Sequence, residues 1–332
     1  MLNPSAKLAS NVFDKPEMKP TRNGFGEGLL EAGEKDKRIV ALCADLAEST
    51  RMLAFKEKWP KRYIELGVAE QNLATVASGL ANYGKIPFIA SYATFSPGRN
   101  NEQIRTTICI NNVPVKIVGS HAGVSVGPDG ATHQALEDMA LMRVLPRMTV
   151  ISPCDSEEAR KATLAAAAHN GPVYLRLGRE KTPLMTTPAT PFELGKAQVM
   201  WQPQDKRKNP DVVVFATGPL VHNALLSAKK LEEKYAVVVV NIHTVKPLDV
   251  KAVLQWGKKA GAVVTVEEHQ IAGGLGSAVA ETLAQGAPVP IEFIGVHDQF
   301  GQSGEPLELI EHYGMGATHI IAAITKAIKR KK

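Results

Sequence analysis

The chain alternates short, almost entirely apolar runs with stretches whose apolar residues recur at helical spacing. In the first half, strands are expected at 38–44, 63–66, 87–90, 114–119, 148–151 and 173–177. Helices are expected between them at 46–58, 70–83, 100–111, 134–144 and 156–170. Because strands without a polar face must be buried on both sides, this alternation predicts a parallel sheet covered by helices on both faces.

The second half repeats the alternation on a smaller scale. Prolines and a polar run interrupt the pattern over 180–210, and a linker is expected at 186–210. Beyond it, strands are expected at 212–216, 236–241, 262–267 and 291–295, with helices at 220–235, 249–260, 274–284, 305–313 and 318–329. The sequence therefore predicts an α/β protein with an N-terminal arm at 1–20 and two domains, at 21–185 and 211–332, each a mostly parallel sheet with helices on both faces.

The composition, with 44% hydrophobic and 22% charged residues, is that of an ordinary globular protein. The net charge of +6 suits small anionic substrates, and no nucleic-acid or membrane partner is expected. No apolar run approaches the roughly 18 residues that span a membrane, and the N-terminus lacks a signal-peptide core, so a cytoplasmic location is expected. Cys43, Cys109 and Cys154 have no metal-site spacing and are expected to be buried free thiols.

One carboxylate stands at an unusual place in the pattern. Residues 62–81 are typical of a strand, a tight turn and a buried helix, and Glu70 opens that helix beside the carboxyl end of the strand. In open α/β sheets, ligands bind at that end. Glu70 either favours the helix N-terminus through the helix dipole or is a buried catalytic carboxylate, and this stretch alone leaves both open.

Polar and aromatic side chains follow the other expected strands of the first half. They are Asp45, Ser49, Phe95, Arg99, His121, Asp129, His133, Arg176 and Arg179. Each alone has an ordinary explanation, such as a helix cap for Asp45. Their gathering at one sheet edge, in loops rich in glycine, is how α/β proteins build active sites, and it predicts one here.

Two glycine-rich segments have to be weighed as dinucleotide-binding loops. GFGEG at 24–28 follows no strand and is rejected, because the fingerprint requires one. AGGLGS at 272–277 follows an expected strand and opens an expected helix, but it lacks the third glycine and the later acidic residue. Close packing of helix on sheet is the preferred interpretation of this loop, and dinucleotide binding is the alternative.

Longer motifs carry a family resemblance. LGVAEQNLATVASGLANYGKIPFIASYATF and VGSHAGVSVGPDGATHQALEDMALMRVLPRMTVISPCD closely resemble the pyrimidine-binding domain of transketolases and deoxyxylulose-phosphate synthases. VVVVNIHTVKPLD and VTVEEHQIAGGLGSAVAE resemble the C-terminal domain of the same family. The resemblance extends over residues 20–330 and implies a C-terminal section of a transketolase.

The resemblance implies a cofactor site for thiamine diphosphate. Glu70 matches the glutamate that hydrogen-bonds the aminopyrimidine nitrogen, and Phe95 matches an aromatic that stacks on that ring. Asp45 matches an aspartate near cofactor and substrate. Arg99 fits the family's loop arginine, for which support and catalysis are both open.

The resemblance also implies a sugar-phosphate site. Asp129 and His133 match catalytic residues that bind the donor's hydroxyls and its developing charge. Four residues match the phosphate-binding set: His121, Arg179, Arg22 and Ser49. Arginine's planar fork suits phosphate, so these matches are chemically coherent.

A required motif is missing. Thiamine-diphosphate enzymes hold Mg²⁺ and the diphosphate with a Gly-Asp-Gly run followed by Asn, and this chain contains no Gly-Asp-Gly. No metal ligand is therefore expected in this chain. The resemblance implies an N-terminal transketolase subunit as the partner that holds Mg²⁺, in an α2β2 assembly with two copies of each chain.

The resulting hypothesis is the C-terminal subunit of a split transketolase that transfers a two-carbon ketol unit between sugar phosphates. Two alternatives within the same chemistry are a deoxyxylulose-5-phosphate synthase and a keto-acid dehydrogenase E1 β subunit. The third alternative is a non-catalytic, transketolase-like protein.

Overall fold

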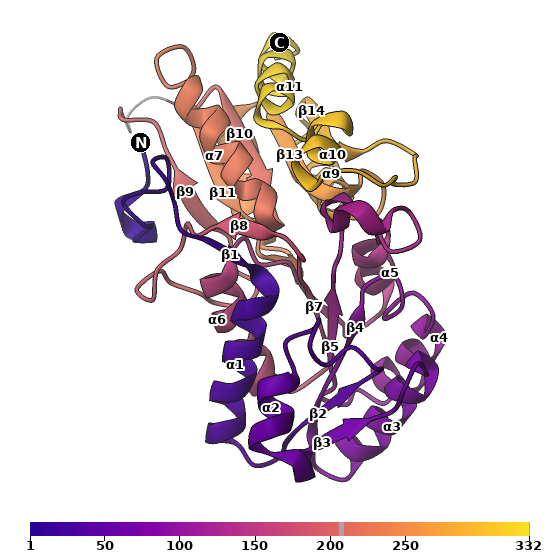
Figure 1. Cartoon of the computed structure of the whole chain (residues 1–332). Helices are drawn as coiled ribbons and strands as arrows, with labels where there is room; N and C mark the ends of the chain where they lie inside the picture. Colours follow the sequence, from indigo (N-terminus) through magenta and orange to yellow (C-terminus); the bar gives the residue numbers. More distant parts are fainter. Residues whose placement is uncertain (206–208, 332) are drawn as a thin grey trace.

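Two mainly parallel sheets organise the chain, the first in the lower and the second in the upper half of Figure 1. The computed structural model describes residues 1–205 and 209–331. The strand order is β12-β6-β7-β5-β4-β2-β3 in the first sheet and β14-β13-β10-β11-β9 in the second. Helices cover both faces of each sheet (Figure 1), so the predicted α/β class with two domains is confirmed.

The first sheet has six parallel strands: β2 (Ile39–Cys43), β3 (Tyr63–Glu65), β4 (Ile86–Tyr92), β5 (Lys116–Ser120), β6 (Thr149–Ile151) and β7 (Val173–Arg176). The main helices around it are α1 (Thr21–Lys35), α2 (Leu53–Lys58), α3 (Glu70–Asn82), α5 (Asp138–Val144) and α6 (Ser156–Ala168), with the short α4 (Asn101–Gln103) and a π-helical turn at Ile104–Cys109. All five residues of β2 and of β5 are buried, because apolar clusters lie on both faces of the sheet. Helices α1 and α6 can pack closely because Gly24 has no side chain. A Cβ at this position would collide with the backbone of Ser156.

The second sheet combines four parallel strands, β10 (Val212–Ala216), β11 (Val237–Asn241), β13 (Val263–Gln270) and β14 (Ile291–Val296), with the antiparallel β9 (Gln198–Trp201). Its helices are α7 (Val221–Lys230), α8 (Val250–Ala260), α9 (Leu275–Gly286), α10 (Pro306–His312) and α11 (Ala317–Lys329). Strand β9 lies inside the range expected to be a linker, so part of that range belongs to the second sheet. Residues 206–208 of the same range lie outside the described residues. The exact domain boundaries stay a prediction.

Two crossings that the sequence did not predict tie the halves together. Strand β12 (Thr244–Lys246) comes from the second half but pairs antiparallel with β6 at the edge of the first sheet. The N-terminal arm lies against the second sheet, where Asn3 N donates to Met200 O at 2.9 Å and the Phe13 ring packs edge-on against Trp201. The short strands β1 (Met18–Pro20) and β8 (Lys181–Pro183) then pair with each other beside α1.

The three cysteines are buried and free, as predicted. Within the residues that the structure describes, no helix has the length and apolar character needed to cross a membrane.

Candidate active site

Glu70 is the first residue of α3 and its carboxylate is only 3% exposed. Gly67, in the left-handed region with φ of 65°, makes the turn that leads from β3 to this helix. Arg99 Nη1 donates to both Glu70 carboxylate oxygens, at 3.1 and 3.2 Å, and Asn100 Nδ2 donates to the Glu70 carbonyl at 2.9 Å. The Arg99 side chain is 51% exposed, so a buried carboxylate faces a cation that solvent reaches.

Aromatic rings connect Glu70 to the histidines of the next loop. The Arg99 guanidinium lies 4.2 Å from the centre of the Phe95 ring, and the His133 ring packs edge-on against Phe95 at 5.3 Å. Tyr92, at the end of β4, stacks on His121 with 3.9 Å between ring centres. The structure therefore brings Glu70, Phe95, Arg99, His121 and His133 together along one sheet edge.

A cavity of about 460 Å³ lies beside this row of rings. It is lined by Arg22, Glu48, Ser49, Arg51, Tyr92, His121, Asp129 and Arg179. All four residues of the expected phosphate set are among them. Arg22 Nη1 donates to Ser49 O at 2.8 Å and lies 3.3 Å from His121 Nε2. The buried Nε of Arg22 has no hydrogen-bond partner among the described residues, so the guanidinium beside the cavity is only partly satisfied by the protein.

His121 is neutral in this environment. Burial lowers the pKa of His121 to about 3, and the nearby Arg22, Arg179 and Arg51 guanidinium groups lower it further in the same direction. Since an arginine can only donate, Nε2 of His121 accepts from Arg22 and the ring proton lies on Nδ1, which is 2.9 Å from Ser120 Oγ. His121 thus presents no positive charge of its own.

Asp129 and Arg179 meet at the other side of the cavity. Arg179 Nη1 donates to Val126 O at 2.6 Å and lies 3.6 Å from an Asp129 carboxylate oxygen. Asp129 ends the short helical turn Val124–Asp129, and its side chain is about one-third exposed. His133 follows on the same loop, with Thr132 Oγ1 2.9 Å from its Nδ1.

Two residues expected at the edge behave differently. Asp45 is exposed, adopts the left-handed φ of 58°, and is not among the residues that line the cavity. Arg176 does not line the cavity: its Nε pairs with Asp138 at 2.8 Å in a buried contact, so Arg176 has the ordinary role of a salt-bridge partner. Arg176 is drawn to this partner because α5, which begins at Asp138, lies next to β7 in space.

Sequence reasoning missed Arg51, Tyr92 and Glu65. Arg51 fell inside an expected helix, but its φ of 64° ends the turn before α2 and directs it to the cavity. Tyr92 was readable as an aromatic at a strand end. Glu65 accepts from the backbone N–H of Asp45 at 2.7 Å; burial raises its pKa, but the Tyr63 hydroxyl and three backbone N–H groups outweigh this and lower it.

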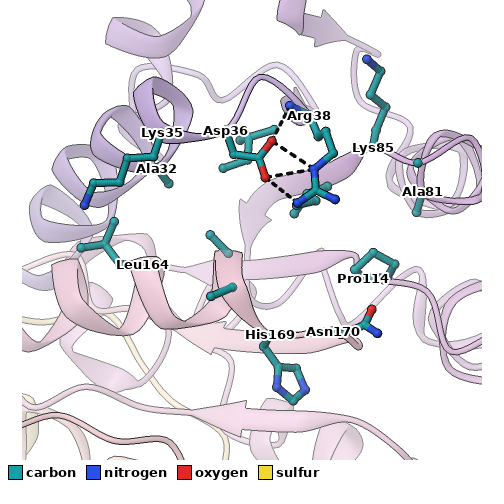
Figure 2. A pocket seen from close by; sticks show the side chains of 15 residues that line it. Ala32, Lys35, Asp36, Arg38, Ala81, Lys85, Pro114, Leu164, His169 and Asn170 are labelled. Atoms are coloured by element: carbon teal, nitrogen blue, oxygen red, sulfur yellow. Dashed lines mark hydrogen bonds and ion pairs between the residues drawn. The ribbon is translucent and has the colours of Figure 1, made fainter.

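A larger cavity, of about 640 Å³, lies at the opposite edge of the first sheet (Figure 2). Its Arg38 is paired with Asp36 at 2.7 Å, and Lys35 is paired with Glu31 at 2.7 Å. Helices α1, α3 and α6 direct their C-terminal ends toward it, where cations are favoured. Its arginine and one of its two lysines are thus already paired, and size alone does not identify the site.

The AGGLGS loop lets helix α9 pack closely against the sheet, which is the interpretation preferred from the sequence. Both Glu267 carboxylate oxygens accept backbone N–H groups at the start of α9, from Leu275 at 2.8 Å and Gly276 at 2.7 Å. A side chain at Gly274 would lie 2.0 Å from Glu267 Oε2. A protein carboxylate therefore occupies the helix end that a dinucleotide phosphate would need.

Family models match both halves of the chain. The model for the transketolase pyrimidine-binding domain matches residues 17–185, and the model for the transketolase C-terminal domain matches residues 203–320. The chain belongs to the transketolase family. All residues named at the site lie in the first matched domain of this transketolase-family chain.

Similar proteins point to a subunit of a divided enzyme. The 6-deoxy-6-sulfo-D-fructose transketolase subunit SqwH of Clostridium sp. (strain MSTE9) is 42% identical over 93% of this chain and 95% of its own length. The 1-deoxy-D-xylulose-5-phosphate synthase of Leptothrix cholodnii is 37% identical over 91% of this chain but only 47% of its own length. A solved split-gene transketolase, described as an inactive beta4 tetramer, has a TM-score of 0.86 at 43% identity and matches over 94% of this chain and 99% of its own. The predicted resemblance to a split transketolase subunit is confirmed.

Proposed function

We propose that this chain is the catalytic C-terminal subunit of a thiamine-diphosphate-dependent transketolase that moves a two-carbon ketol unit between sugar phosphates. The observation that supports the proposal is that a buried carboxylate and an arginine-lined cavity lie along the same sheet edge. Glu70 is 3% exposed at a helix start, and the cavity with its unpartnered Arg22 Nε lies beyond the rings of Tyr92 and Phe95. Cytoplasmic location is part of the proposal.

The residues around Glu70 fit one end of thiamine diphosphate. The Arg99 guanidinium, a planar group with N–H donors, hydrogen-bonds Glu70 and lies against the Phe95 ring. An aminopyrimidine is also planar and carries ring and amino nitrogens, so it would use the same carboxylate and the same ring face. Arg99 is half-exposed and free to swing toward solvent when the cofactor enters. Asp45, at the neighbouring strand end, would face the cofactor's substrate side.

The chemistry divides between cofactor and protein. Bound thiamine diphosphate supplies a carbon nucleophile for the ketose carbonyl. Glu70 holds a proton at the pyrimidine nitrogen, in a buried position that strengthens that hydrogen bond. His133 and Asp129 bind the donor's hydroxyls and exchange protons with them. Arg22, Ser49, His121 and Arg179 hold the terminal phosphate and so fix the sugar's distance from the reacting carbon.

A second chain completes the site. Without a Gly-Asp-Gly run, this chain has no family-type ligands for Mg²⁺ or the diphosphate, which we assign to an N-terminal transketolase subunit. We propose two copies of each chain in the active assembly. The solved beta4 tetramer of a similar split-gene subunit, described as inactive, fits a chain that needs a different partner.

The test is reconstitution. The purified chain should show no ketol transfer with thiamine diphosphate and Mg²⁺, and adding an N-terminal transketolase subunit should restore transfer. Formation of a ketose phosphate from a ketose donor and an aldose phosphate is the measured product. Transfer by the chain alone would overturn the division of labour, and no transfer by the complete assembly with any ketose donor would overturn the activity.

A further inference from the structure

Positive charge exceeds negative charge among the residues that line the cavity. Three guanidinium groups, those of Arg22, Arg51 and Arg179, face two carboxylates, those of Glu48 and Asp129. Burial lowers the pKa of Arg22, and the positive charges of Arg51 and Arg179 lower it further, so these cations repel one another. A bound anion would relieve this repulsion.

Local structure holds Arg51 in place against its own backbone preference. Its φ of 64° lies in the left-handed region, which a residue with a Cβ rarely adopts. Arg51 Nε donates to Asn23 Oδ1 at 2.9 Å, which fixes the plane of the guanidinium. Gly26 of α1 makes room for it, because a Cβ there would lie 2.9 Å from Arg51 Cβ. Three features of the fold thus converge on the placement of one side chain.

The remaining donors of Arg51 are unused. Arg179 pairs with Asp129 and Glu180, and Arg22 donates to Ser49. Across residues 1–205 and 209–331, by contrast, Arg51 forms no ion pair and its Nη atoms have no hydrogen-bond partner. A planar fork with two free N–H ends, held by its third nitrogen, suits two oxygens of a tetrahedral anion.

We propose that Arg51 binds the terminal phosphate of the sugar substrate directly and makes the cavity selective for a dianion. The inference rests on the proposed function, because it takes the cavity to be the phosphate end of the substrate site. A third guanidinium interacts with a charge of −2 about twice as strongly as with a charge of −1, by Coulomb's law. Arg51 therefore contributes more to the binding of a phosphate ester than to that of a monoanionic sulfonate of the same shape.

Binding to the isolated chain tests the inference without the partner subunit. Ribose 5-phosphate is titrated into the wild type and variants by calorimetry, in buffer free of phosphate and sulfate. Arg51→Met should weaken binding about tenfold, the size expected for one charge-assisted hydrogen-bonded contact. Arg51→Lys should recover part of that loss. Arg38→Met is the matched control, because Arg38 is an exposed arginine at the opposite sheet edge (Figure 2) and should leave binding unchanged.

Arg51→Gly separates folding from binding. Glycine adopts φ of 64° without strain, so this variant should melt at or above the wild-type temperature and still lose the affinity. The preference for ribose 5-phosphate over its 5-sulfonate analogue should fall several-fold in Arg51→Met and Arg51→Gly. If Arg22→Met weakens binding while Arg51→Met does not, the assignment of Arg51 is overturned alone. If the wild type and every variant bind ribose 5-phosphate equally weakly, the phosphate cavity of the proposed function fails with it.

Discussion

The two parallel sheets use their carboxyl edges in opposite ways. At the first edge, Arg22 Nε and the outer nitrogens of Arg51 have no partner within the described chain, and Glu70 is paired only with a half-exposed arginine. At the second edge, both oxygens of Glu267 accept backbone N–H groups, and Glu268 Oε1 accepts from Ser125 N at 2.7 Å. One edge leaves polar atoms without a protein partner, whereas the other uses them to hold the protein itself.

This difference explains why a glycine motif is a weak guide to a site. AGGLGS follows a strand and opens a helix, as a dinucleotide loop does, but a buried glutamate fills the helix end; burial raises the pKa of Glu267 to about 7. GPDGATH, in contrast, lies in a loop whose Asp129 faces the cavity. The state of the polar atoms separates the two loops, and the glycines do not.

The largest expected effect follows from removing the carboxylate that we propose binds the cofactor. Glu70→Ala should lower the rate of ketol transfer by the assembled enzyme about 10²–10⁴-fold, because no group would then hold the proton at the pyrimidine nitrogen. The fold should survive, since the ion-pair partner of this carboxylate within the described residues, Arg99, is half-exposed. Steady-state rates and thermal melting measure the two outcomes.

Glu267→Ala is the converse variant. It should leave binding of ribose 5-phosphate unchanged but lower the melting temperature, because the N–H groups of Leu275 and Gly276 would lose their acceptors in a buried place; each costs about 1–3 kcal/mol. A Glu70→Ala chain that unfolds, or a Glu267→Ala chain that melts normally, would contradict the contrast between the edges.

The buried ion pair between Arg176 and Asp138 lies where the two edges meet. Arg176 Nη2 also donates to Glu268 O at 2.8 Å, so this one side chain joins α5 to β13. Arg176→Met should lower the free energy of unfolding by about 3–5 kcal/mol, because it leaves the Asp138 charge buried without a cation. Urea denaturation measures the loss. Arg176→Met combined with Asp138→Asn should regain part of it; equal loss in the double variant would argue against the ion pair as the cause.

Much of this arrangement was readable from the sequence, for identifiable reasons. Fully apolar runs located the parallel strands, and the strand–turn–helix pattern located Glu70. Strand β12 was missed because Thr244–Lys246 has no apolar pattern and gains its partner only from β6, far away in the chain. Arg51 was missed because residues 46–58 carry helical spacing, whereas the chain turns at Arg51 to pack against Gly26 of α1. Tertiary contacts, which no local pattern encodes, decided both.

The pH dependence of stability tests whether His121, beside the arginines of the first edge, is buried as a neutral imidazole. The pKa of His121 is lowered to about 3, whereas an unfolded histidine titrates near 6.5. The unfolded state alone therefore takes up a proton below pH 6.5, so the contribution of neutral His121 is complete above pH 6.5 and is lost as the pH falls toward 3. At pH 5 the free energy of unfolding is therefore about 2 kcal/mol lower than it is above pH 6.5.

His121→Asn removes this titration and keeps an acceptor for Arg22 at a left-handed position that asparagine tolerates. The wild type should lose about 2 kcal/mol more than the variant between pH 7 and pH 5, measured by urea denaturation in phosphate-free buffer. His243 and His269 also have lowered pKa values, but they are common to both chains and cancel in the difference. Parallel stability curves would show that His121 is not buried as neutral imidazole.

The smallest expected effect concerns a contact between the two edges, in which Glu268 of the second sheet holds a loop of the first domain. Glu268 holds the loop of Asp129 through Ser125 N, and Gln134 Nε2 holds the same loop by donating to Val124 O at 3.0 Å and to Gln302 O at 2.9 Å. Glu268→Ala should speed amide hydrogen exchange over residues 124–130 and raise the KM for the donor ketose about tenfold, while the KM for an acceptor aldose changes less.

Glu268→Gln keeps an oxygen that accepts from Ser125 and should restore most of both values. If exchange over 124–130 is unchanged in Glu268→Ala, the second sheet only packs against the loop and does not position it. An exchange increase in both variants would instead assign the effect to the charge of Glu268, which Arg176 and Ser125 stabilise against the cost of burial.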